Sequence, residues 1–353
     1  MAKTIYLIFI ALIFSKFCNA QDTLSKIEFG AYLDGYFTYD FSKPTNHQRQ
    51  YTTQYDQHNT FAINHAWISG SYKGESVRSV IALQLGSFPL RNQGGEPEVY
   101  QQLIYKAYAG LRITKNSWLD FGVFEGHFGY ESALSIDRAL LSPALSTEYT
   151  PYYQTGIRYG HELGDKTKIT FVLLNGWQSI AETNDQKSFG MAISHQLMPW
   201  LNLSYGNYFG NESTDSNDQN RSHHNFVAQI NPIEKLELAI QADFTNQKNA
   251  VDDQELQTSM FTFVSSYRFT DKWSIAGRYE NASDKDGLLI EGVVGPIKMS
   301  VVSLALNYSP AENTSLKMEV KTYKDELRNF VGDKGSGTGA FVLSGGLAHR
   351  LGQ

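Results

Sequence analysis

The sequence is poor in the residues that cross-link or interrupt a chain. It has one cysteine and nine prolines among 353 residues, so an intramolecular disulfide framework is excluded. Acidic residues outnumber basic ones, 36 against 30, and no stretch of the chain forms a basic stripe. This balance argues against nucleic acid as a partner, because a nucleic-acid surface needs clustered Lys and Arg.

Long apolar runs are missing after the first twenty residues. Residues 1–20 combine Lys3 near the start with a short apolar stretch and small residues at the end, which is the pattern of a secretory signal peptide. A transmembrane anchor would need about 18 apolar residues, and Lys16 interrupts the run earlier. Cleavage is predicted before Gln21, which removes the cysteine and two lysines and changes the formal net charge from −6 to −8.

Aromatic residues and glycine are abundant instead, with 21 Tyr, 21 Phe and 29 Gly, a composition that favours β-strands. Runs of about ten residues alternate between apolar and polar positions, as half-buried or membrane-spanning strands do. Sixteen are predicted, over residues 27–40, 60–72, 77–87, 101–113, 117–126, 153–163, 167–177, 188–197, 200–210, 223–231, 235–246, 258–269, 272–281, 299–309, 314–324 and 338–350. The segment 60–72 alternates poorly, so 14 or 18 strands remain alternatives.

The connections between these strands alternate between short and long. Short turns are expected at 73–76, 114–116, 164–166, 198–199, 232–234, 270–271 and 310–313. Long polar loops are expected at 41–59, 88–100, 127–152, 178–187, 211–222, 247–257, 282–298 and 325–337. A soluble β-sandwich has no reason to place all its long loops at one end, whereas outer-membrane barrels have short periplasmic turns and long external loops. Residues 21–353 are therefore predicted to form a single all-β domain, a transmembrane antiparallel β-barrel.

Each predicted strand has one apolar and one polar face. In the strand 235–246, Leu236 and Leu238 alternate with Glu237 and Gln241. An Arg or Lys costs about 2 to 4 kcal/mol at the bilayer midplane, so charges that recur opposite the apolar face indicate a watery lumen. The candidate pore-lining residues are Arg78, Lys106, Arg112, Asp120, Arg158, Glu162, Lys168, Asp243, Arg268, Arg278, Glu280, Lys317, Glu319 and Lys321. They are interpreted either as a selectivity-setting wall or as cross-strand ion pairs, and their mixed signs predict weak ion selectivity.

Tryptophans begin three of the strands, directly after short turns: Trp118, Trp200 and Trp273. Trp prefers the membrane interface, so these positions predict an aromatic girdle at the short-turn end. Strand-initial Trp on a soluble core is the alternative. In the hairpin 153–177, Tyr153 is expected to face lipid, and Arg158 on the other face is expected to face water.

The longest connection, residues 127–152, contains an apolar, helix-capable stretch at 133–141. A loop in water does not need such residues, but a loop folded against a surface does. We expect it to bend into the barrel mouth and to narrow it. Its candidate constriction residues are Glu131, Asp137 and Arg138, with the two acids facing wall arginines such as Arg158. Packing on the barrel rim or on a partner protein remains the alternative.

Signals of catalysis are weak. His127, His223 and His224 lie near loop ends, and pairs of aspartates occur at 215 and 218 and at 252 and 253. Solvated loop polarity explains these residues, and no Ser, His and carboxylate set has an identifying spacing. The sequence predicts no catalytic residues, no metal site and no cofactor.

Several stretches resemble the OmpL-like β-barrel porin family of Gram-negative outer membranes. They are YDFSKP at 39–44, FGYESA at 128–133, TPYYQTG at 150–156, VLLNGWQ at 172–178 and DKWSIAGRYE at 271–280. The resemblance implies an outer-membrane barrel for passive diffusion. One departure is the end of the chain, HRLGQ, because many such barrels end on an aromatic residue that the insertion machinery recognises.

The sequence therefore favours an outer-membrane channel for small hydrophilic solutes, without an enzymatic step. Its expected partners are outer-membrane lipid, the solutes and the barrel-insertion machinery, and analogy with porins adds a homotrimer. A surface binding or adhesion barrel that acts through its long external loops is the alternative function.

Overall fold

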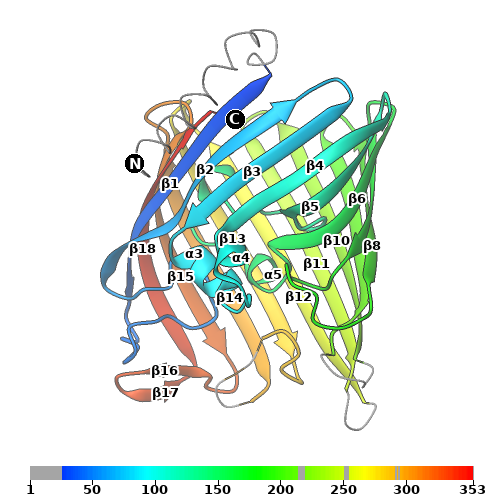
Figure 1. The fold of residues 1–353 in the computed structure, drawn as a ribbon. Coiled ribbons are helices and arrows are strands. Elements are labelled where there is room, and N and C mark those ends of the chain that lie inside the picture. The colour runs from blue at the N-terminus through cyan, green and yellow to red at the C-terminus, as the bar shows by residue number, and fades with distance from the viewer. Residues whose placement is uncertain (1–25, 214–218, 250–253, 291, 293–294, 353) are drawn as a thin grey trace, which may run out of the picture.

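The computed structural model describes residues 26–213, 219–249, 254–290, 292 and 295–352. Its strands close into one sixteen-stranded antiparallel barrel (Figure 1), in which β1 (Ile27–Asp40) completes the ring by pairing with β18 (Gly339–Leu351). This confirms the predicted fold class and strand number. The predicted signal segment and the aspartates at 215, 218, 252 and 253 lie outside the described residues.

The remaining barrel strands are β2 (Thr60–Lys73), β3 (Val77–Leu85), β4 (Ile104–Thr114), β5 (Ser117–Glu125), β6 (Tyr153–Leu163), β7 (Thr167–Leu174), β8 (Ser188–Met198), β9 (Leu201–Asn211), β10 (Asn220–Ile233), β11 (Leu236–Lys248), β12 (Glu255–Arg268), β13 (Trp273–Asp284), β14 (Ile297–Tyr308) and β15 (Thr314–Asp325). The strands predicted at 27–40 and 153–163 have the predicted bounds, and every other boundary lies within three residues of its prediction. A small hairpin of β16 (Phe330–Gly332) and β17 (Gly335–Gly337) lies in the last long loop.

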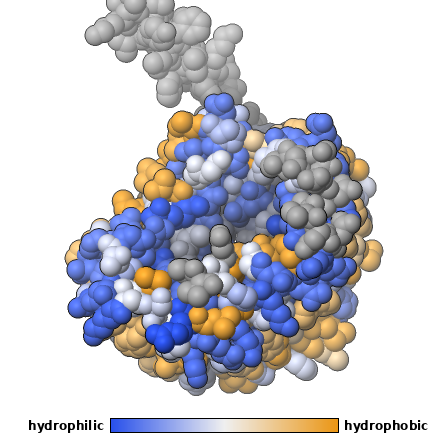
Figure 2. Space-filling view, turned by 90° about the horizontal axis from the view of Figure 1, so that it is seen from below, coloured by the Kyte–Doolittle hydropathy of each residue, from blue (hydrophilic) through white to orange (hydrophobic). Residues whose placement is uncertain are grey.

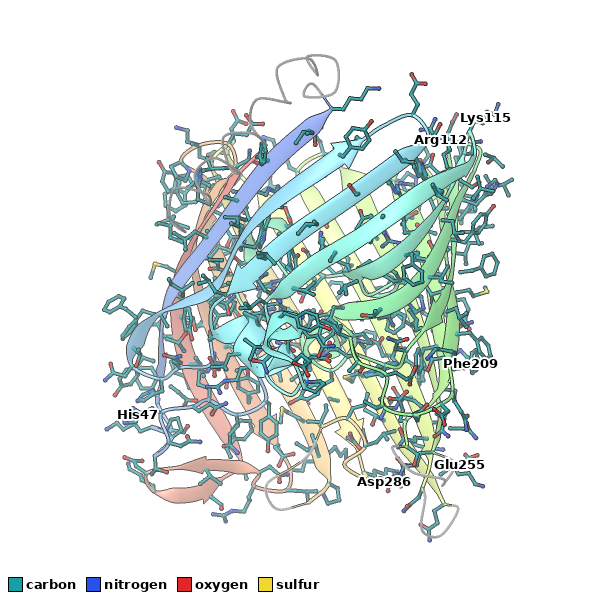
Figure 3. The ribbon with its side chains drawn as sticks, in the orientation of Figure 1. His47, Arg112, Lys115, Phe209, Glu255 and Asp286 are labelled. Carbon is teal, nitrogen blue, oxygen red and sulfur yellow. The ribbon has the colours of Figure 1, made fainter. Side chains whose placement is uncertain are left out.

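Short helical segments lie only in the long loops of the described chain: α3 (Ser87–Gln93), α4 (Val99–Gln102), the 3-10 turn η2 (Ser135–Asp137) and α5 (Leu145–Glu148). No helix among the described residues is long and apolar enough to cross a membrane. The long loops gather at one end of the barrel and the short turns at the other. Figure 3 labels Arg112 and Lys115 at the short-turn end and His47, Glu255 and Asp286 at the long-loop end.

The two faces of the wall differ as their alternation predicts. Along β14, Val302, Leu304 and Leu306 are exposed on the outer face, whereas Val301 and Ser303 are buried on the inner face. Viewed from the long-loop end, hydrophilic side chains cover most of the molecule and hydrophobic side chains gather around its circumference (Figure 2). An apolar exterior around a polar interior is the arrangement that a bilayer requires.

The poor alternation of β2 has a local cause. Asp34 pairs with His65 and Gly35 pairs with Ile63, so Asn64 is an extra residue without an opposite partner. Asn64 and His65 are both buried, and the alternation resumes after this β-bulge. A bulge shifts the face of each following side chain by one position.

Two predicted side-chain orientations are wrong. Trp118 was expected in the aromatic girdle, but it shares the inner face of β5 with Asp120, while Trp200 and Trp273 are exposed at the short-turn end. Tyr153 was expected to face lipid, yet it is only 5 % exposed, because Phe88 of α3 packs in the same apolar cluster. Trp118 follows the strand period, whereas the burial of Tyr153 comes from tertiary packing.

The outer face can be tested by placing a charge on it. Leu304 is 54 % exposed near the middle of β14, so Leu304→Arg is expected to lower the free energy of unfolding in phospholipid vesicles by about 2–4 kcal/mol. Ser204→Arg, on the inner face of β9, is the control and is expected to change it little. Urea titration followed by tryptophan fluorescence measures both, and equal losses would contradict the assigned faces.

Candidate functional site

The loop of residues 127–152, here called the inner loop, runs through the barrel lumen. It forms hydrogen bonds to ten wall strands, β1, β6, β9 to β15 and β18. Gly129 donates its backbone N–H to Asn225 at 3.2 Å, and Asn307 donates to the carbonyl of Ala139 at 2.9 Å. The α5 turn is visible inside the barrel in Figure 1. The loop therefore lies on the inner wall and not on the rim.

The apolar residues of the inner loop pack against the wall. Leu134 lies in a cluster with Tyr32 and Trp67, and Leu140 is fully buried against Ala239 and Val264, among others. Burial of such side chains stabilises the docked loop by about 1.5–3 kcal/mol each. The helix-capable stretch 133–141 forms only the single turn η2, and its apolar side chains divide between two wall clusters, with Leu134 in one and Leu140 in the other.

Glycines in the wall provide space for the loop. A Cβ atom on Gly206 of β9 would lie 2.5 Å from Cβ of Phe128, and one on Gly346 of β18 would lie 2.6 Å from a methyl group of Leu141. Real Cβ atoms essentially never come this close to another heavy atom. Glycine in a strand often marks such a close approach, and these two positions are occupied by glycine because the loop touches the wall there.

A buried ion cluster holds the middle of the loop. Arg278 of β13 contacts carboxylates of Glu131, Glu280 and Glu319 at 3.0, 2.8 and 3.8 Å, and donates to the carbonyl of Ser142 at 2.8 Å. The carboxylate of Glu319 accepts from the backbone N–H and the hydroxyl of Ser142, both at 2.6 Å. A buried charge is tolerated only when it is paired and hydrogen-bonded, as each of these is.

The same cluster sets the ionisation of Glu131. Burial alone would raise the pKa of this carboxyl, but the guanidinium groups of Arg278 and Arg138 outweigh burial, so its pKa is lowered. Glu131 therefore stays ionised at neutral pH and remains a partner for Arg278.

Two details of the predicted constriction are corrected by these contacts. Glu131 and Asp137 do face wall arginines, but these are Arg278 and Arg350, the latter at 2.8 Å from Asp137. Neither acid contacts Arg158. Arg138 is buried and donates to the carbonyl of Leu141 at 2.5 Å and to the hydroxyl of Tyr55 at 3.3 Å, so it holds the loop together.

Two further loops fold inward, which the sequence did not reveal. Glu148 of α5 accepts from Thr52 at 2.6 Å, and Tyr55 donates to Asp34 of β1 at 2.5 Å, so the 41–59 loop packs against both the inner loop and the wall. Phe88 of α3 contacts the ring of Tyr152 edge-on. Aromatic residues in polar loops were the available signal, since a loop in water does not need them.

The inner wall of β3 to β6 carries a row of basic and aromatic side chains. Arg78 and Arg158 share the carboxylate of Asp120, with donor distances of 2.7 to 3.0 Å. The guanidinium carbons of Arg78 and Arg112 lie 4.5 and 4.8 Å from the ring centre of Trp118. Lys106 pairs with Glu125 at 2.7 Å, farther along the same wall.

The structure separates the fourteen predicted pore-lining residues into three groups. Buried inner-wall residues, most of them under the inner loop, are Asp243, Arg278, Glu280, Lys317, Glu319 and Lys321. On the wall of β3 to β6 lie Arg78, Lys106, Arg112, Asp120 and Arg158. At the short-turn end, exposed, lie Glu162, Lys168 and Arg268. The alternation along each strand places all fourteen side chains on the inner face of the wall. The inner loop then determines which of them remain accessible.

The interpretation of the histidines as solvated is wrong for two of them. His223 is fully buried, with Nε2 3.3 Å from Asp243 and its ring stacked on Phe128. His127 bonds to Gln154 and to the carbonyl of Asn207, both at 2.7 Å. Among the described residues, no group of three or more His, Cys, Asp or Glu side chains could hold a metal ion.

Two hollows lie on opposite faces of the wall. A polar cavity of about 440 Å³ lies inside, between the inner loop and β11 to β15, and is lined among others by Tyr130, Lys317 and Arg350. An apolar groove of about 890 Å³ lies outside, with Phe61 and Trp273 among its lining residues. The outer groove faces hydrocarbon in a bilayer, so the polar interior is the candidate functional site.

The family model described as Putative beta-barrel porin-2, OmpL-like, matches residues 26–351. Solved structures with a similar fold include a loop-deletion mutant of OmpT from Vibrio cholerae (12% identity, TM-score 0.61, 92% of this chain and 99% of that chain). An anion-selective porin from Comamonas acidovorans is similar at 11% identity (TM-score 0.61, 92% and 99%), and the channel DcaP of Acinetobacter baumannii at 12% (TM-score 0.61, 92% and 97%). No curated protein sequence matches the chain.

The contact between wall and loop can be tested with Gly206→Val. The added side chain is expected to displace Phe128 and to loosen the inner loop. Limited trypsin digestion of the folded protein, followed by mass spectrometry, should then detect cleavage after Arg138, which is buried in the wild type. Gly277→Val is the control, because Gly277 lies on the outer face near Leu304. Equal protection of all three proteins would show that the loop does not depend on this glycine.

The ion cluster can be tested with Arg278→Met. Removing the guanidinium leaves Glu131, Glu280 and Glu319 without their shared buried partner, and the loss of one member of such a cluster costs about 3–5 kcal/mol. A lower thermal unfolding midpoint and faster trypsin cleavage of the inner loop are expected. Arg268→Met, which removes an exposed partner of Glu234, should leave both measurements close to wild type.

Proposed function

The chain belongs to the OmpL-like family of β-barrel porins, and from this premise we propose that it is an outer-membrane channel through which small hydrophilic solutes diffuse passively. The observation that carries the proposal is the charged inner wall of a closed sixteen-stranded barrel. Barrels of sixteen strands are wide enough to enclose an aqueous channel. Membership of a porin family also favours a channel over an enzyme.

In the proposed channel, the inner loop sets the width of the lumen. It crosses from β5 to the wall of β9 to β15 and β18, where Glu131 pairs with Arg278 of β13 and Asp137 pairs with Arg350 of β18. The proposed route of a solute lies beside the wall of β3 to β6, where Arg78 and Arg158 remain 31 % and 22 % exposed. Glu131, Asp137 and Arg138 would then act by holding the loop in place and not by facing the solute.

A surface binding role is the second candidate function. It is favoured by contacts that order two external loops against each other. Tyr51 donates to the carbonyl of Asn329 at 2.9 Å, and Val331 donates to the side chain of Gln50 at 2.7 Å. Ordered loops of this kind can support a binding surface, but they would not by themselves carry a current across a bilayer.

The proposed channel must be exported and assembled before it functions. We infer that residues 1–20 are removed as a signal peptide and that the insertion machinery delivers the barrel to the outer membrane. A homotrimer is the proposed assembly, since OmpT of Vibrio cholerae, similar in fold (TM-score 0.61, 10% identity), was solved in a trimer form. Mass spectrometry of the mature N-terminus and light scattering of the detergent-solubilised protein test these two points.

Planar-bilayer recording of the refolded protein tests the channel. The wild type is expected to give discrete conductance steps, and deletion of residues 133–145 is expected to increase their size, because it removes the part of the loop that spans the lumen. Deleting Asp333 and Lys334 at the tip of the β16–β17 hairpin is the control and should leave conductance unchanged.

A silent bilayer with folded wild-type protein would leave the surface binding role as the better candidate. Unchanged conductance in the loop deletion would remove the constriction and keep the channel. If the deletion fails to refold, Gly206→Val serves as the second variant, since it loosens the loop without shortening the chain.

A further inference from the structure

The charges of the lumen divide into a covered set and an accessible set. The inward carboxylates Asp34, Asp243, Glu280 and Glu319 are at most 2 % exposed, and the basic side chains among them, Arg278, Lys317 and Lys321, are at most 4 % exposed. By contrast, the side chains of Arg78, Arg158 and Lys106 are 31 %, 22 % and 25 % exposed. The near balance of charges in the sequence therefore does not describe the wall of β3 to β6, where Asp120 is covered and its two arginine partners are accessible.

The accessible basic groups form a row along neighbouring strands. Arg112 lies near the short-turn end of β4 (Figure 3), Arg78 lies next to it on β3, and Arg158 lies midway along β6. Asp120, only 1 % exposed, is the one carboxylate that Arg78 and Arg158 share, and no described carboxylate lies within salt-bridge distance of Arg112. Three guanidinium groups and one carboxylate leave an excess of two positive charges on this wall.

A glycine allows the row to form. Arg78 on β3 reaches Asp120 on β5 across the intervening strand β4, where Gly110 faces inward. A Cβ on Gly110 would lie 2.3 Å from a carboxylate oxygen of Asp120 and 3.1 Å from Cγ of Arg78. An ion pair that spans two strand spacings needs this gap. The ion pair between Arg78 and Asp120 therefore explains why a glycine occupies position 110.

Aromatic rings hold the guanidinium groups in place. Trp118 contacts Arg78 and Arg112, and the ring of Phe124 lies 4.5 Å from the guanidinium carbon of Arg158. Asp120 accepts from the Nε and one terminal nitrogen of Arg78 and of Arg158. The other terminal nitrogen of each has no protein acceptor among the described residues. A planar fork with free N–H groups matches the oxygen pairs of carboxylates and phosphates.

We propose that Arg112, Arg78 and Arg158 form a path that attracts and passes small oxyanions bearing a carboxylate or phosphate group. This rests on the proposed channel function and names the class of solute. An ion pair that serves only to rigidify the barrel would need one arginine for Asp120. A second arginine on Asp120, and an Arg112 without a carboxylate partner among the described residues, are instead expected of a surface that binds anions.

Reversal potentials in an asymmetric KCl gradient test the sign of the selectivity. The wild-type channel is expected to prefer chloride to potassium. Arg112→Gln, which leaves no carboxylate unpaired, should lower the chloride-to-potassium permeability ratio. The combination of Arg78→Gln, Arg158→Gln and Asp120→Asn with it should lower the ratio about threefold or more, since a change of about one kT in local potential has that effect.

Two variants control this experiment. Arg328→Gln removes the same charge from an external loop and should leave the ratio unchanged. Gly110→Val keeps every charge but closes the gap between Arg78 and Asp120, so it should lower the ratio less than the charge variants do.

Adding inorganic phosphate or acetate tests the class of solute. Either anion should reduce the chloride current in the wild type, and reduce it less in the arginine variants.

The outcomes separate the inference from the proposed function. A wild-type protein without current would remove the channel and this path together. A channel that conducts but prefers potassium, or whose ratio is the same in the wild type and the arginine variants, would overturn the path and keep the channel. A chloride preference with no response to phosphate or acetate would overturn the assignment to oxyanions.

Discussion

The backbone of this protein must find all its hydrogen-bond partners within the chain wherever it meets hydrocarbon. For strands, only closure satisfies this constraint, and the pairing of β1 with β18 provides it. Closure separates the side chains into an apolar outer set and an inner set that need not be apolar. The polar wall, the space it encloses and the need to fill part of that space all follow from this separation.

A ring of sixteen strands is too wide for its own inward side chains to fill. The inner loop occupies part of the lumen, and its attachment relies on features of both surfaces. Glycines at 206 and 346 make room for Phe128 and Leu141, while Arg278 balances carboxylates from loop and wall. The docked loop also covers acidic groups, so the same packing that narrows the lumen determines its remaining charge. Width and electrostatics are consequently coupled in this fold.

The strands were predictable because their signal is local. Period-two alternation and the order of short and long connections depend only on neighbouring residues, and even the irregular segment around Asn64 was marked by its poor alternation. The entry of the inner loop into the lumen was also predictable, since Leu134 and Leu140 have no reason to be apolar in water. Its partners were not, because Arg278 and Arg350 lie more than a hundred residues away in the chain. The inward position of Trp118 was predictable from the strand period, but its contacts with arginines of two other strands were not, and the cover over Tyr153 depends on a helix that the sequence did not reveal.

The distance along the chain between the loop and its attachment points also orders the events of assembly. Ser142 contacts Glu319, 177 positions later, and most wall strands that hold the inner loop follow it in the chain. Contacts between such distant segments require the intervening chain to be in place, so they form late. Ring closure joins still more distant segments, since Ala31 of β1 pairs with Leu351 of β18. The inner loop is attached to both of these strands, through Ser135 to Asp34 and through Asp137 to Arg350, so the width of the lumen depends on the two ends of the barrel being joined.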